Sequence, residues 1–90
     1  MSNERDEANR VLTAAGFTRE PLTEAGYFFT RTAKDGIRYI VAGNVEGDWS
    51  ADVYSDRESH DLGDYSGGFV VGSAYNPMRL VQFLGNAGLI

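Results

Sequence analysis

Carboxylate side chains are concentrated in one short stretch of this 90-residue chain. Seven of its thirteen acids lie between residues 46 and 64, where Arg57 is the one base. Residues 1–45 carry six acids and six bases and residues 65–90 carry only Arg79, so the net charge of −5 is the −6 of this stretch and the one positive charge of Arg79. Such an acidic band favours basic surfaces or cations as partners and repels nucleic acid phosphates. Its members are Glu46, Asp48, Asp52, Asp56, Glu58, Asp61 and Asp64.

Part of the band falls on a predicted strand over residues 49–55. Alternation along a strand places Trp49, Ala51 and Val53 toward the core. We therefore expect acids at even positions on the solvent side: Glu46, Asp48, Asp52 and Asp56. Residues two apart on a strand are separated by about 7 Å, so such a row would present charge in a line, as a nucleic acid strand presents phosphates. Three interpretations stay open: a solvated face, a partner-binding face and a cation site.

Two tyrosines accompany these acids. Strand alternation puts Tyr54 on the acidic side, between Asp52 and Asp56, and Tyr65 follows Asp64. Tyrosine is enriched at the energetic centres of protein interfaces, so both are candidate interface anchors. The alternative is that both pack across the second sheet face.

A dedicated metal site is not expected. Residues 56–61 alternate oxygen ligands like the start of a calcium loop, but an EF-hand needs Gly at its sixth position and Glu at its twelfth. This chain has Asp61 and Gly67 there. One histidine and no cysteine also disfavour zinc, and no cofactor is expected.

No catalytic residue is assigned from the sequence. Ser59, His60 and Asp61 are neighbours in sequence, whereas the members of a catalytic triad meet from separate elements. A loop histidine is the simpler interpretation, and residues 66–68 lack the lysine and glycine spacing of phosphate-binding loops. We expect a protein that is not an enzyme.

Length and composition indicate a single small domain spanning residues 1–90. The absence of cysteine favours a reducing compartment, and no apolar segment is typical of a signal peptide or a membrane span. We expect a cytoplasmic protein with no membrane partner. The bases outside the band are scattered among acids, so direct nucleic acid binding is not expected.

The elements that must position these residues follow from periodicity. Apolar residues at Ala8, Val11, Leu12 and Ala15 predict an amphipathic first helix that ends at Gly16. Strands are predicted over 27–33, 37–44, 49–55 and 69–75, with turns at 34–36 and 46–48. Gly72 is expected to mark a bulge or a close backbone approach. Residues 56–68 are predicted to form a long loop.

A final helix begins at Asn76 and Pro77, and should end near residues 85–88. Its apolar face is predicted to comprise Leu80, Val81, Phe83, Leu84 and Ala87. The predicted fold is α+β: an N-terminal helix, a four-stranded antiparallel meander and a C-terminal helix, with both helices on one sheet face. The aromatic core residues would be Phe29, Tyr39, Trp49 and Phe69.

In size, acidity and lack of cysteine or catalytic motif, the chain resembles the small inhibitor proteins of phages and mobile elements, anti-CRISPR proteins among them. The resemblance is one of composition over the whole chain. It implies a protein-binding module that blocks the basic nucleic-acid-binding surface of a host defence complex. The expected contacts to Arg and Lys of that protein partner come from Asp48, Asp52, Asp56, Glu58, Asp61 and Asp64, with Tyr54 and Tyr65 as apolar anchors.

A structural role is the alternative. The second sheet face and the strand edges could form a homodimer, or could add the chain to a larger complex as a subunit. Salt separates the two hypotheses, because charge-driven binding weakens as salt rises and apolar assembly does not.

Overall fold

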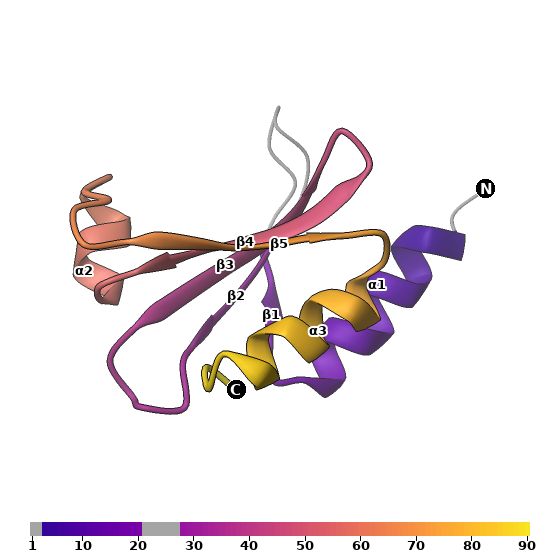
Figure 1. Ribbon diagram of the computed structural model, residues 1–90, viewed down its shortest axis with the longest axis horizontal. Coiled ribbons are helices and arrows are strands. Elements are labelled where there is room, and N and C mark those ends of the chain that lie inside the picture. Colours follow the sequence, from indigo (N-terminus) through magenta and orange to yellow (C-terminus); the bar gives the residue numbers. More distant parts are fainter. Residues whose placement is uncertain (1–2, 21–27) are drawn as a thin grey trace.

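The computed structural model describes residues 3–20 and 28–90, and over these residues the chain is α+β with a five-stranded antiparallel sheet and three helices (Figure 1). The strands run in the order β1-β2-β3-β4-β5, so each pairs with its neighbours in sequence. In chain order the elements are α1 (Asn3–Ala14), β1 (Thr18–Arg19), β2 (Phe29–Thr32), β3 (Tyr39–Val45), β4 (Asp48–Tyr54), α2 (Arg57–Asp61), β5 (Phe69–Ala74) and α3 (Pro77–Asn86).

The α+β class and the antiparallel meander are confirmed, but two elements differ from the prediction. A further strand, β1, pairs with β2 through Thr18 opposite Thr30. Two residues are too few to show an alternating pattern in the sequence. The predicted loop over 56–68 contains α2, which has no buried residue and therefore no apolar periodicity. The predicted strand start at Tyr27 lies outside the described residues.

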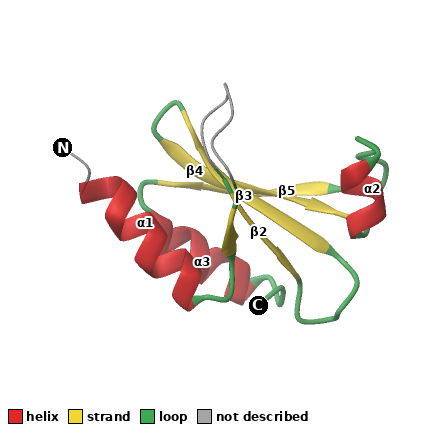
Figure 2. Cartoon of the chain, turned by 180° about the vertical axis from the view of Figure 1, so that it is seen from behind, coloured by secondary structure: helices red, strands yellow, loops and turns green. Residues whose placement is uncertain are grey.

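Helices α1 and α3 lie side by side on one face of the sheet (Figures 1 and 2). Leu12 of α1 and Leu80 and Leu84 of α3 are fully buried against the sheet. The sheet contributes alternate residues of its central strands, including Ile40, Trp49 and Val53. Each large apolar side chain buried in this way stabilises the fold by about 1.5–3 kcal/mol.

Local sequence determines the ends of these elements. Gly16 ends α1 with φ of +91°, and the amide of Phe17 donates to the carbonyl of Leu12 at 2.9 Å. The β3–β4 turn has positive φ at both Glu46 and Gly47, the geometry of a two-residue type I′ hairpin. At α3, the Asn76 side chain accepts from the amide of Arg79 at 2.9 Å, with Pro77 in the first turn. The predicted helix start is confirmed.

Three predicted core positions need correction. Phe69 is 40% exposed, because β5 has β4 as its one strand neighbour among the described residues. Tyr39 is buried, but its neighbours Ile40 and Ala42 face the helices, so Tyr39 packs on the opposite face. Ala87 is exposed, because it follows the last helical residue, Asn86.

Candidate protein-binding surface

The sheet face opposite α1 and α3, called the open face below, carries the predicted acidic residues of β4. Trp49, Ala51 and Val53 are buried toward the helices, as predicted. The intervening residues Asp48 and Asp52 are exposed, and Tyr54 is half-buried. The sequence-based assignment of the two faces of this strand is therefore confirmed.

The predicted straight row of carboxylates is interrupted. Glu46 lies in the hairpin turn and Asp56 lies beyond the strand, so β4 itself holds two of the four acids. Asp52 is four positions after Asp48 on the strand, which corresponds to about 13 Å. Asp48 is thus remote from the remaining site residues, which gather at the other end of the strand.

Aromatic rings connect β4 to α2 and to the segment that follows it. Tyr54 meets Tyr65 edge-on with ring centroids 5.1 Å apart. It meets His60 of α2 in the same way, also at 5.1 Å. The Tyr65 hydroxyl lies 3.5 Å from Asp52 Oδ1. Two predicted anchors and one predicted acid are therefore neighbours in space, and the tyrosines also pack across this face as the alternative anticipated.

The ring cluster continues to β3. His60 packs on Tyr39 with centroids 5.0 Å apart, and the Arg57 guanidinium lies 5.6 Å from the Tyr39 ring centre. A guanidinium over a tyrosine ring at an exposed site contributes about 0.5–1 kcal/mol. These contacts dock α2 against the open face, although none of its residues is fully buried.

Backbone hydrogen bonds hold two of the acids in place. Asp56 caps α2, since its Oδ1 accepts from the amide of Ser59 at 2.7 Å. Asp64 Oδ1 accepts from the amide of Ser66 at 3.0 Å. Both bonds favour the ionised carboxyl, and the pKa of Asp56 and that of Asp64 are lowered, in each case first by this backbone bond.

The pKa of Tyr65 is shifted in the opposite direction, upward. Partial burial raises the pKa of its hydroxyl, and the nearby Asp52 carboxylate adds to the effect. The phenol therefore stays protonated and can donate a hydrogen bond to Asp52 or to a ligand.

We call acidic tyrosine surface the seven candidate residues that belong to the end of β4, to α2 and its N-cap, and to the segment directly after α2. They are Asp52, Tyr54, Asp56, Glu58, Asp61, Asp64 and Tyr65. All of them except Tyr54 are exposed. Glu58 and Asp61 lie on α2 itself, where Asp61 Oδ2 is 4.0 Å from the Arg57 guanidinium.

Three further residues belong to this arrangement and are not among the candidates that the sequence indicates. Arg57 interrupts the acidic band, His60 falls in a predicted loop, and Tyr39 is expected in the core. His60 Nδ1 lies 3.2 Å from Asp61 Oδ1, and its ring contacts Tyr39 and Tyr54. The detectable signal is Asp56, a favourable N-cap residue for a helix that contains Arg57 and His60.

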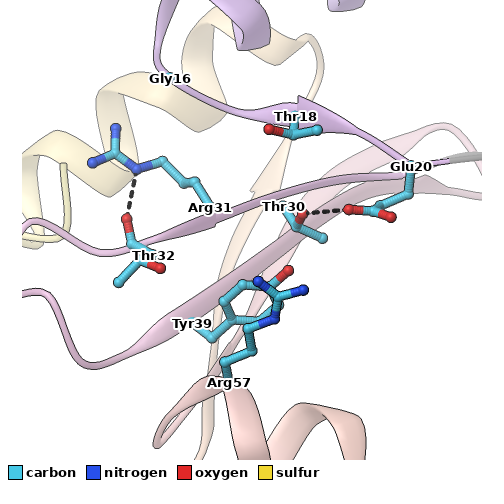
Figure 3. Close-up of a pocket in the computed structure, with 8 residues that line it drawn as sticks. All are labelled: Gly16, Thr18, Glu20, Thr30, Arg31, Thr32, Tyr39 and Arg57. Atoms are coloured by element: carbon cyan, nitrogen blue, oxygen red, sulfur yellow. Dashed lines mark hydrogen bonds between the residues drawn. The ribbon is translucent and has the colours of Figure 1, made fainter.

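A polar cavity of about 460 Å³ adjoins this surface on the β1–β2 side (Figure 3). Its lining includes hydroxyls of three threonines, one of which, Thr30, donates to Glu20 Oε2 at 2.7 Å. The Arg57 side chain stands beside the Tyr39 ring, and both side chains line the cavity (Figure 3). The full lining is Gly16, Thr18, Glu20, Thr30, Arg31, Thr32, Tyr39 and Arg57.

Comparison with known proteins adds no family assignment. No family model matches the sequence, and no match was found among the curated proteins or the solved structures compared with the chain. Over residues 3–20 and 28–90, no group of three or more acidic or histidine side chains is arranged to hold a metal ion. No helix in the same ranges has the length and apolar character needed to cross a bilayer.

Proposed function

We propose that this chain is a non-enzymatic protein-binding module whose acidic tyrosine surface occupies a basic, nucleic-acid-binding surface of a partner protein. The observation that carries the proposal is a pair of packed tyrosine rings with the Asp52 carboxylate beside them, next to a capped helix and a segment that carry four further acids. Asp52 lies beside Tyr65, and Tyr65 packs on Tyr54. Acids alone would be a solvated face, whereas tyrosines are enriched at the energetic centres of interfaces and acids beside them suit the polar rim of an interface.

Charge and aromatic contact would have separate roles in such a complex. The carboxylates would pair with Arg and Lys of the partner, raising the association rate and disfavouring partners that are not basic. The tyrosines would supply the desolvated contact that slows dissociation. Because Asp56 and Asp64 are bonded to backbone amides, their carboxylates are already positioned, and binding need not order them.

The biological form of this activity would be that of a phage or mobile-element inhibitor that acts as a DNA mimic. One support is the acidic net charge of −5. The other is that six of the eight candidate residues lie between Tyr54, at the end of β4, and Tyr65, shortly after α2. A partner that binds phosphates would offer the basic groove that this surface fits.

Capture from host lysate tests the proposal. The tagged wild type is compared with a variant carrying Asp52→Asn and Glu58→Gln, which removes two charges from the surface. A matched variant with Glu7→Gln and Glu46→Gln removes two charges elsewhere, so both variants have the same net charge. Each exposed pair contributes up to about 1 kcal/mol, so the surface variant should bind a captured partner about tenfold more weakly at low salt.

The control must retain binding for the proposal to hold. Equal loss in both variants would show that net charge alone drives capture. Retention by the surface variant would place the interface elsewhere on the molecule.

A further inference from the structure

The outer edge of β5 is an exposed strand that carries no charged residue and no proline. Among the described residues β5 pairs with β4 on one side and forms the end of the sheet on the other. Edge strands normally carry charges or proline that block further pairing. The stretch from residue 65 to residue 78, which includes all of β5, has no Asp, Glu, Lys, Arg or His.

Apolar side chains are exposed along the same strand. Val70 is 60% exposed on the open face and Phe69 is 40% exposed on the helix side. Both therefore keep apolar area in water that a further strand would cover. Met78, at the start of α3, is also exposed.

The sequence of this strand is nearly symmetric about Val70. Residues 68–72 read Gly, Phe, Val, Val, Gly. In an antiparallel pair of two copies related by a two-fold axis at Val70, Val70 would face Val70, Phe69 would face Val71, and Gly68 would face Gly72. Opposite residues in an antiparallel pair point to the same face, so every apolar residue would meet an apolar residue.

A bulge in β5 limits how many residues of this strand can pair with a second copy. Ser50 pairs with Gly72 and Trp49 with Ala74, so Ser73 is the extra residue of a bulge. A Cβ on Gly72 would lie 2.8 Å from Ser50 Cα, which explains the predicted close approach. The regular part of β5 therefore runs from Phe69 to Gly72 and lies within the symmetric segment.

We infer that β5 pairs with β5 of a second copy, joining two five-stranded sheets into one antiparallel sheet centred on Val70. Charge favours a second copy over the basic partner proposed above, because this edge offers that partner no carboxylate. Asp52, which pairs with Val70, is the nearest strand acid. Its copy would lie three strand spacings away, about 14 Å, which exceeds the screening length of about 8 Å at physiological salt.

The consequence is a bivalent arrangement. A two-fold axis perpendicular to the joined sheet keeps both open faces on the same side. The two acidic tyrosine surfaces would then face one direction, so that a partner with two basic sites could engage both.

Molecular mass in solution is the first test, by light scattering after gel filtration over a range of concentrations. The wild type should reach twice the 9.9 kDa mass of the chain, and added salt should preserve the dimer. Val70→Lys places two like charges at the axis and should give the monomer mass. Leu62→Lys, an equally charged change at an exposed residue off the edge, should leave the dimer intact.

Cysteine cross-linking is the second test and does not depend on the behaviour of the lysine variant. The chain has no cysteine, and opposite residues of an antiparallel pair have Cα atoms about 4.5–5.5 Å apart, within disulfide range. Val70→Cys should form a linked dimer under mild oxidation far faster than Leu62→Cys. A wild type that stays monomeric at the highest concentration, or equal cross-linking of the two cysteine variants, would overturn the inference.

Discussion

Single carboxylates in this protein are held by backbone amides, and this sets both their position and their charge. Asp56, Asp64 and Asp35 each accept a hydrogen bond from an amide two or three residues ahead. An amide donor stabilises the ionised form, so the pKa of each of these carboxyls is lowered. The bonds therefore fix where the carboxylates of Asp56 and Asp64 stand, and they keep these two groups ionised to a lower pH than an unbonded aspartate.

Asp35 gives this effect a measurable consequence. Bonds from the amides of Ile37 and Arg38 and from the Arg38 side chain lower its pKa from 3.8 to about 2. Because the folded pKa is depressed, the ionised carboxyl stabilises the fold above about pH 4, and this contribution is lost as the pH falls through about 2. Asp35→Asn should reduce stability near neutral pH and converge with the wild type in acid.

Urea unfolding of the wild type and Asp35→Asn at a series of pH values measures this directly. A difference in unfolding free energy that stays constant down to about pH 2 would mean that ionisation of Asp35 makes no contribution to stability.

Among the helices and strands, long periodic segments were predictable and short contact-dependent ones were not. Asn76 and Pro77 predict the start of α3, and alternation from Trp49 to Tyr54 gives the faces of β4. In contrast, β1 exists because Thr18 and Arg19 find partners on β2, and α2 exists because Asp56 caps it and its side chains dock on tyrosines. The strand pairing and the docking are tertiary contacts with no periodic trace in the sequence, whereas the Asp56 cap is local and is a signal that the sequence contains.

The candidate surface divides in the same way. The outward direction of Asp52 and Tyr54 follows from strand parity and could be predicted. The meeting of Tyr54 with Tyr65 and His60 could not, because it depends on how residues 57–65 fold back over the sheet. Because residues 57–65 fold back over the end of β4, Asp48 at the start of that strand is left apart from the other acids.

Two glycines test the packing of the elements. At Gly72 φ is +137°, and an added Cβ would lie 2.8 Å from Ser50 Cα and 2.9 Å from the Trp49 carbonyl oxygen. Gly72→Ala should therefore lower the free energy of unfolding by about 1–3 kcal/mol. Gly85 lies in α3, and a Cβ added there would meet no atom within 4 Å, so Gly85→Ala should raise it by about 0.5–1 kcal/mol.

Urea titration of the two alanine variants checks both signs in one experiment. A Gly72→Ala protein as stable as the wild type would show that β5 does not approach β4 as closely as described.

The whole molecule separates a charged surface from a neutral edge. Asp52 lies on the open face and further acids lie on α2 and beside it, whereas the neighbouring strand β5 has no charged residue. The two surfaces should respond to salt in opposite directions. Binding through the carboxylates weakens as salt rises. Pairing at β5 should strengthen as salt rises, because salt screens the repulsion between two acidic copies.

Competition with nucleic acid distinguishes a surface that blocks a basic groove from one that merely binds beside it. The binding of a captured partner to its nucleic acid is followed while this protein is added. We expect displacement of the nucleic acid by the wild type and by the Glu7→Gln, Glu46→Gln variant, with weaker displacement by the Asp52→Asn, Glu58→Gln variant. A partner that holds nucleic acid and this protein at the same time would contradict the proposed function.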